Sequence, residues 1–143
     1  MQILKEKSRA KSQITFDEDF NVPDAKPDAG RLIQNKGRII MDDVRLTDGK
    51  GILTGNLQVD ILYVGEESGI VSSLTVKLPF EETLNLKNII NGDKMCLKWE
   101  IEDLTIRLIH SRKLNIKALV TFCATVDETE QIRLPVALDA EEV

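Results

Sequence analysis

The sequence predicts an all-β fold, an antiparallel β-sandwich or barrel-like single domain, and three observations lead to this class. Apolar and polar residues alternate with a period of two over most apolar stretches, the pattern of half-buried strands. Turn residues separate these stretches at roughly 10–16 residue intervals. The length of 143 residues suits one domain with its own core. One short helical turn and an extended N-terminal arm complete the expected fold.

The first 22 residues form one extended segment whose apolar residues fall on even positions, such as Ile14, Phe16 and Val22. The alternation is strong over residues 14–22 and weak before Ala10. Fully extended, residues 4–22 would measure on the order of 60 Å, whereas a globule of this size is roughly 36 Å across. Residues 1–11 are therefore predicted to be surplus to their own sheet.

An ordered corner follows at residues 21–33, where Pro23 and Pro27 are each followed by Asp. Proline fixes φ and has no amide proton to donate, so regular pairing is expected to stop at Pro23. Asp28 is predicted to cap a short helical turn over residues 29–34. With apolar residues around it, the corner is expected to serve folding and packing rather than ligand binding.

Strands are predicted for most of the remaining chain, and Asp48-Gly49 provides the strongest hairpin signal between them. Pro79 is expected to end one strand, and residues 81–86 form a short extended piece. The apolar phase shifts near Glu102-Asp103, which indicates a β-bulge. Residues 86–91 are a second helical candidate. The predicted strands are residues 37–46, 52–64, 70–78, 94–109 and 114–126.

Little in the sequence points to catalysis, a cofactor or a metal. The single His110 is either a solvated turn residue or the base of a triad with Glu102 or Asp103. One histidine and two distant cysteines lack the spacing of a zinc site. A net charge of −5 argues against nucleic-acid binding, and no apolar run approaches the ~20 residues that span a bilayer. The N-terminus lacks the pattern of a secretory signal.

The two cysteines are predicted to face outward, because Cys96 and Cys123 share the parity of charged and polar residues on their strands. Counting from the last turn places Cys123 opposite Glu100, about 13 Å from Cys96. A disulfide needs Cα atoms within about 7 Å, so the thiols are expected to stay free or to link subunits.

Charge is distributed unevenly along the chain. Residues 1–11 carry four cations against Glu6, a net charge of +3, and residues 127–143 carry six carboxylates against Arg133, a net charge of −5. The ends are either solvated or complementary, joining copies head to tail. We divide the chain into a basic arm (1–12), a β domain (13–126) and an acidic segment (127–143). The candidate assembly residues are Ile3, Leu4, Lys5, Lys7, Arg9 and Lys11 of the arm and, for links between subunits, Cys96 and Cys123.

An ordered set of motifs between residues 14 and 126 resembles the SPOCS domain, the repeated module of SipL-type spore-envelope proteins in anaerobic spore-formers. The most specific part is the Val-Pro-Asp…Lys-Pro-Asp block of the corner. The motifs are Val22-Pro23-Asp24-Ala25-Lys26-Pro27-Asp28, Gly37 opening a strand, Gly55 before residues 57–63, Leu78-Pro79-Phe80 and Arg112-Lys113-Leu114-Asn115-Ile116-Lys117-Ala118.

The resemblance implies an all-β fold without catalytic residues and a role in assembling the spore coat or outer layers. SipL tethers the coat to its basement ATPase through a LysM domain, which this sequence lacks. A coat, exosporium or appendage subunit is therefore expected, made in the mother-cell cytoplasm and deposited on the spore surface. Its expected partners are copies of itself, joined by strand exchange, and other envelope proteins. The alternative is a protein- or glycan-binding module that tethers envelope layers within a larger multidomain protein.

Overall fold

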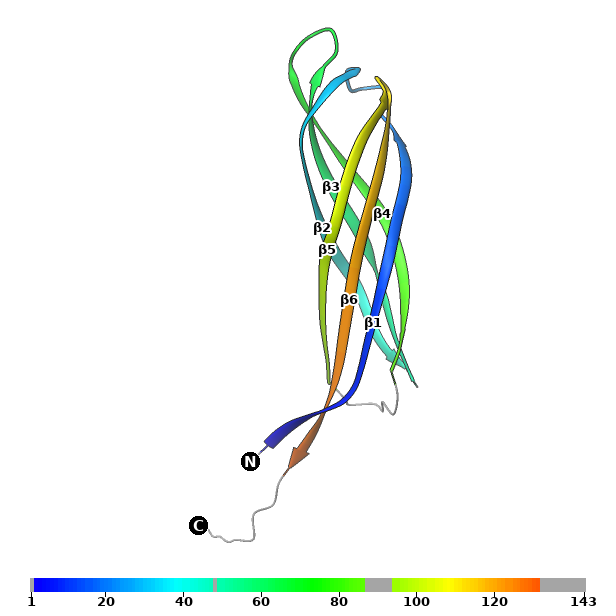
Figure 1. The fold of residues 1–143 in the computed structure, drawn as a ribbon, viewed down its shortest axis with the longest axis vertical. Helices are drawn as coiled ribbons and strands as arrows, with labels where there is room; N and C mark the ends of the chain where they lie inside the picture. Colours follow the sequence, from blue (N-terminus) through cyan, green and yellow to red (C-terminus); the bar gives the residue numbers. More distant parts are fainter. Residues whose placement is uncertain (1, 48, 87–93, 132–143) are drawn as a thin grey trace.

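The protein is an elongated β-sandwich in a computed structural model that describes residues 2–47, 49–86 and 94–131 (Figure 1). Side chains are described for residues 8–47, 49–86 and 95–127. Six antiparallel strands form two three-stranded sheets, with strand orders β1-β6-β5 and β2-β3-β4. The strands are β1 (Gln2–Asn21), β2 (Ala29–Thr47), β3 (Lys50–Gly65), β4 (Val71–Asn85), β5 (Lys94–His110) and β6 (Lys113–Gln131). The predicted sandwich class is confirmed.

The core lies between the two sheets and is built mainly from their central strands, β3 and β6. Alternate residues of β6 from Leu114 to Val126 are almost completely buried, as are those of β3 from Leu53 to Tyr63. Phe80 of β4 contacts Phe16 of β1 and Phe122 of β6, with ring centroids 6.2 and 5.3 Å apart. Edge strands of opposite sheets also touch, β2 beside β5 and β1 beside β4.

The Asp-Gly hairpin and the bulge are confirmed. Thr47 pairs with Lys50, and Gly49 has a φ of 73°, a conformation that costs glycine little. The register of β5 against β6 shifts between Ile101 and Asp103, which makes Glu102 the additional residue of the bulge.

The predicted helical turn at residues 29–34 is wrong, because the chain already forms strand from Ala29 onward. The amide of Ala29 donates to the carbonyl of Ser111, so it is not available for a helical cap. The corner turns earlier, where the amide of Lys26 donates to the carbonyl of Pro23 at 2.9 Å. The second helical candidate, residues 86–91, lies almost entirely outside the described residues.

Pro79 does not end its strand, contrary to the prediction. β4 continues through it to Asn85 and includes the piece predicted separately at residues 81–86, except for Leu86. The reason is the position of β4 at the edge of its sheet, where a residue can lack an amide donor without leaving a ladder partner unpaired.

The N-terminal segment is paired rather than surplus. β1 runs through residue 12 without a break, and its register with β6 extends from Gln2↔Gln131 to Asn21↔Lys113. The size estimate behind the predicted arm assumed a round globule, whereas Figure 1 shows strands running along a long axis. Beyond Lys94, where β5 begins opposite Asp127, β1 and β6 continue as a two-stranded ribbon. Residues 132–143 lie outside the described residues.

Gly55 provides a test of this architecture, since the carbonyl oxygen of Ile40 and the ring of Phe80 occupy the space beside it that a Cβ would need. An added Cβ would overlap that oxygen and lie 3.1 Å from Phe80 Cζ. Gly55→Ala should lower the free energy of unfolding by about 1–3 kcal/mol in urea titrations. Thr83→Ala, at an exposed site on β4, is the control, and equal losses in the two variants would contradict the assignment.

Candidate functional site: the clamped corner and the outer sheet faces

Arg112, in the turn between β5 and β6, holds the corner that links the two sheets. Its Nη1 donates to the carbonyl of Lys26 at 2.8 Å and to Oδ1 of Asp28 at 2.9 Å. Its Nη2 donates to the carbonyls of Val22 at 3.0 Å and Pro23 at 2.9 Å. One planar guanidinium thus satisfies four oxygens around a turn in which regular pairing has stopped.

Backbone and side-chain bonds tie the same corner to both neighbouring loops. The amide of Val22 donates to the carbonyl of Arg112, and the amide of Glu66 donates to the carbonyl of Asp28. The hydroxyl of Tyr63, fully buried on β3, donates to the carbonyl of Pro27 at 2.9 Å. Val22 is itself buried, while the rings of Pro23 and Pro27 lie at the surface. The proline-aspartate block therefore contributes carbonyl oxygens and fixed turns, which is a structural role.

The residues after Arg112 anchor the end of β1. Nδ2 of Asn115 donates to Asp17 and to Asp19, each at 2.9 Å, and Lys113 pairs with Asp19 at 3.5 Å. The bond from Asn115, with the charge of Lys113, holds the pKa of Asp19 below its usual value. The sequence places Arg112 and Asn115 in a motif but does not indicate their role. A cation at a hairpin turn together with two Pro-Asp pairs was the signal that could have predicted this contact.

The other motif positions also serve packing. Phe80 of the Leu78-Pro79-Phe80 motif lies in the aromatic cluster, Leu78 packs against the core, and Pro79 is exposed on the edge strand. A Cβ on Gly37 would lie 2.8 Å from Cδ2 of Leu104, so this glycine lets β2 approach β5.

The cysteines lie on the outer face of the β1-β6-β5 sheet, Cys96 exposed and Cys123 half-buried, and both are free. Cys123 pairs with Lys98 and not with Glu100 as counted, because shifts at Ile101/Asp103 and Leu108/His110 each move the register by one. The thiols are thus diagonal neighbours, whose Cα atoms are typically about 7–8 Å apart. This is closer than expected but still wider than the usual disulfide.

The predicted contact residues of the arm lie along β1. Ile3, Leu4 and Lys5 pair in register with Glu130, Thr129 and Glu128, and Lys7 occupies the irregularity between Glu6 and Ser8. The basic start of the chain therefore runs beside the acidic end of β6 within one molecule. Farther along, Arg9 and Lys11 line a surface groove with Lys98, half-exposed Trp99 and Cys123.

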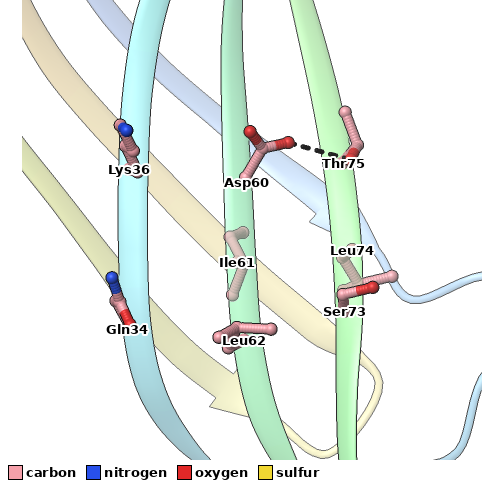
Figure 2. Close-up of a pocket in the computed structure, with 8 residues that line it drawn as sticks. All are labelled: Gln34, Lys36, Asp60, Ile61, Leu62, Ser73, Leu74 and Thr75. Carbon is pink, nitrogen blue, oxygen red and sulfur yellow. Dashed lines mark hydrogen bonds between the residues drawn. The ribbon is translucent and has the colours of Figure 1, made fainter.

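The outer face of the β2-β3-β4 sheet carries a second groove (Figure 2). Gln34, Lys36, Asp60, Leu62, Ser73 and Thr75 line it, and Thr75 Oγ1 donates to Asp60 at 2.9 Å. Exposed apolar side chains at Ile33, Leu62, Ile70 and Val71 mark the same end of the sheet. Figure 2 shows polar and aliphatic side chains from three neighbouring strands along this groove, with the bond between Thr75 and Asp60 as a dashed line.

His110 is engaged locally, since its Nδ1 accepts from the amide of Arg112 at 3.1 Å. The described partner of Glu102, one of the two carboxylates considered for orienting His110, is the hydroxyl of Thr121. Among the described residues no three His, Cys, Asp or Glu side chains come together as a metal site. Nor does this part of the chain contain a helix with the length and apolarity needed to cross a membrane.

Comparison with known families gives one match. A family model described as SipL, SPOCS domain, matches residues 28–109, more than half of the chain. The match begins inside the corner and ends just before the turn that carries Arg112. No curated protein and no solved structure matches the chain.

Removing the clamp should destabilise the protein. Arg112→Ala is expected to lower the free energy of unfolding by about 2–3 kcal/mol, because charge-assisted bonds to several corner oxygens are lost. Arg112→Lys should recover less than half of this loss, since an ammonium cannot reproduce the planar fork. Chemical denaturation monitored by Trp99 fluorescence measures both changes.

Arg45→Ala is the matched control, because Arg45 forms an exposed pair with Asp43, and its effect should stay within about 0.5 kcal/mol. Pro27→Ala with Asp28→Ala probes the corner from the other side and should also lower the melting temperature. If the Arg112 variants melt like the control, the corner does not depend on this guanidinium.

Tyr63 should make stability fall at high pH. Burial raises the pKa of its hydroxyl above the usual value, so above a pH of about 10 the unfolded chain loses this proton first. The free energy of unfolding then declines with rising pH, whereas below that pH both states keep the proton and this group adds no pH dependence. Tyr63→Phe should cost about 1 kcal/mol near neutral pH, because Pro27 loses its donor, and should remove the alkaline decline. Parallel stability curves for the two proteins between neutral and alkaline pH would contradict this account.

Proposed function

The chain belongs to the SipL, SPOCS-domain family, and from this premise we propose that it is a non-catalytic, self-associating assembly module of the bacterial spore envelope. The family is associated with sporulation and is in general structural rather than enzymatic. The protein is made in the mother-cell cytoplasm and becomes part of the coat, exosporium or an appendage. Its partners are further copies of the chain and other envelope proteins.

The main support for the proposal is that the family motifs stabilise the sandwich rather than form a binding or catalytic site. The corner is clamped by Arg112 and Asp28, and the sandwich is packed through Gly37, Gly55 and Phe80. This leaves the outer faces and the strand edges as the surfaces that can act on other molecules. Flat faces and open edges are surfaces through which β-proteins assemble.

Among the edges, β1 supports self-association by strand exchange. It keeps one register from Ser8 to Asn21, whereas β2 and β5 contain bulges and β4 contains Pro79, features that protect edges. The register places Lys5 opposite Glu128 in one chain. The same pairs form between two chains if each β1 lies on its neighbour's β6, which would bring basic and acidic ends together.

A cross-link tests the exchange, since Lys11 lies directly opposite Cys123. In a Lys11→Cys, Cys96→Ser chain, oxidation should join the introduced thiol to Cys123, because cross-strand partners lie within disulfide range. Exchange predicts covalent dimers and longer species on non-reducing gels after oxidation at high concentration. Monomers alone at a concentration where the protein assembles would contradict exchange.

The larger proposal is tested in two ways. Light scattering after size-exclusion chromatography should show a mass that rises with concentration, and a clean monomer would favour the alternative binding module. Immunogold labelling of sporulating cells and purified spores should place the protein in the surface layers. Label confined to the mother-cell cytoplasm would contradict a role in the envelope.

A further inference from the structure

The outer face of the β2-β3-β4 sheet carries two bands of opposite charge. Arg38 and Lys77 lie in one row, on either side of Gln58. Four residues before Gln58 in β3, Thr54 lies between Glu81 of β4 and Asp43 of β2. Asp42, the bulge residue, lies next to Asp43. The rows are about 13 Å apart at the usual strand rise. The positive and negative rows therefore share one face, but the distance between them is too long for ion pairs within one molecule.

The structure leaves most of these charges without an ionic partner. Within the described residues, Arg38, Lys77 and Glu81 take part in no ion pair. Asp42 accepts one hydrogen bond, from Nδ2 of Asn56 at 3.0 Å, which fixes it on the outer face. The other charges nearby are partnered, since Asp43 of the acidic row pairs with Arg45 of the next row and Lys36 has Asp60 beside it in register.

The acidic band is also hollowed. Asp42 and Glu81 line a surface depression of about 540 Å³, together with Arg45, Thr54, Gly55, Asn56, Pro79 and Phe80. Arg45, the one cation in this lining, is already paired with Asp43 at 3.1 Å, so Asp42 and Glu81 are the carboxylates left for a partner. A long cationic side chain arriving from outside can enter this depression and meet two carboxylates.

We propose that this face is a two-fold contact between two copies of the chain, on which Arg38 and Lys77 of each copy meet Asp42 and Glu81 of the other. A two-fold axis between the facing sheets, crossing the strands at Asn56, lays β2 over β2 and β4 over β4 with strand directions reversed. The row Arg38–Gln58–Lys77 then covers the acidic row of the second copy. Half-buried Ile40 and exposed Pro79, in register with Asn56, meet at the axis.

The pattern is self-complementary, which an isologous interface requires. One symmetry operation forms each charge pair twice, and the neighbouring charges already have opposite charges beside them within the sheet, Arg45 with Asp43 and Lys36 with Asp60. Aligned packing of twisted sheets is a common arrangement of β-proteins. The contact deepens the proposed self-association and rests on it. It closes a pair, so it is distinct from strand exchange, which can continue along a polymer.

Charge reversal tests the contact. Arg38→Glu with Lys77→Glu places like charges in register across the axis and should weaken the pair at least about tenfold at low salt, as measured by sedimentation velocity. Arg107→Glu with Lys117→Glu is the matched control, with the same change in net charge at exposed positions on the other sheet, and should leave the association constant unchanged. Raising the salt should weaken the wild-type pair, because exposed charges are screened.

A charge-swapped chain adds a test that keeps the net charge. Combining Arg38→Glu and Lys77→Glu with Asp42→Lys and Glu81→Lys restores complementarity, so this chain should pair with itself. It should not pair with the wild type, since like charges then meet at every contact. A swapped chain that associates no better than the reversed one would overturn the proposal.

The outcomes separate the contact from the proposed function. If the wild type associates and Arg38→Glu with Lys77→Glu does not change its association constant, the assignment of this face is wrong and self-association stands. If the wild type stays monomeric at every concentration, self-association itself fails, and the contact fails with it.

Discussion

The fold depends on one guanidinium. The chain leaves the first sheet at Asn21 and enters the second at Ala29, and over the intervening residues no ladder satisfies the backbone. Arg112 fills that gap by donating to three carbonyls and one carboxylate that converge on it from the corner. Its turn belongs to the β5-β6 hairpin, so the same residue couples the last hairpin to the first crossover. The proline-aspartate motif supplies the oxygens that accept hydrogen bonds from this side chain.

Bulges determine much of the remaining geometry. Two of them in β5 move its register by two residues relative to β6, and three in β2 interrupt its pairing with β3. The bulge at Met41/Asp43 is where the carbonyl of Ile40 crowds Gly55, and it also turns Asp42 onto the outer face. The same irregularities that protect the edges of the sheets therefore shape the surface that remains for contact.

The strands, the Gly49 turn, the bulge at Glu102 and the outward cysteines could be predicted, because each follows from local alternation or from the φ preference of one residue type. The exact register of β5 against β6 could not be predicted, because the shift between Leu108 and His110 does not change the alternation of apolar residues. The helix at residues 29–34 was predicted from a local capping rule, and the long-range bond from Arg112 overrides that rule. The N-terminal part of β1 was expected to be unpaired because the domain was assumed to be round. The charge bands could not be predicted, because the register between strands decides which residues lie side by side on a sheet face.

The pairing of β1 with β6 determines how the molecule responds to mechanical load. The two strands are antiparallel, so Gln2 and Gln131 lie opposite each other at the same end of the long axis, far from the Arg112 corner (Figure 1). A force that separates these two ends acts along the inter-strand hydrogen bonds and opens them one after another, as in unzipping. A force that pulls both ends in one direction against the corner acts along the strands, so the two backbones carry it and β1 does not slide past β6. In a layer built from such units, the direction of attachment would decide whether each unit peels open or bears tension.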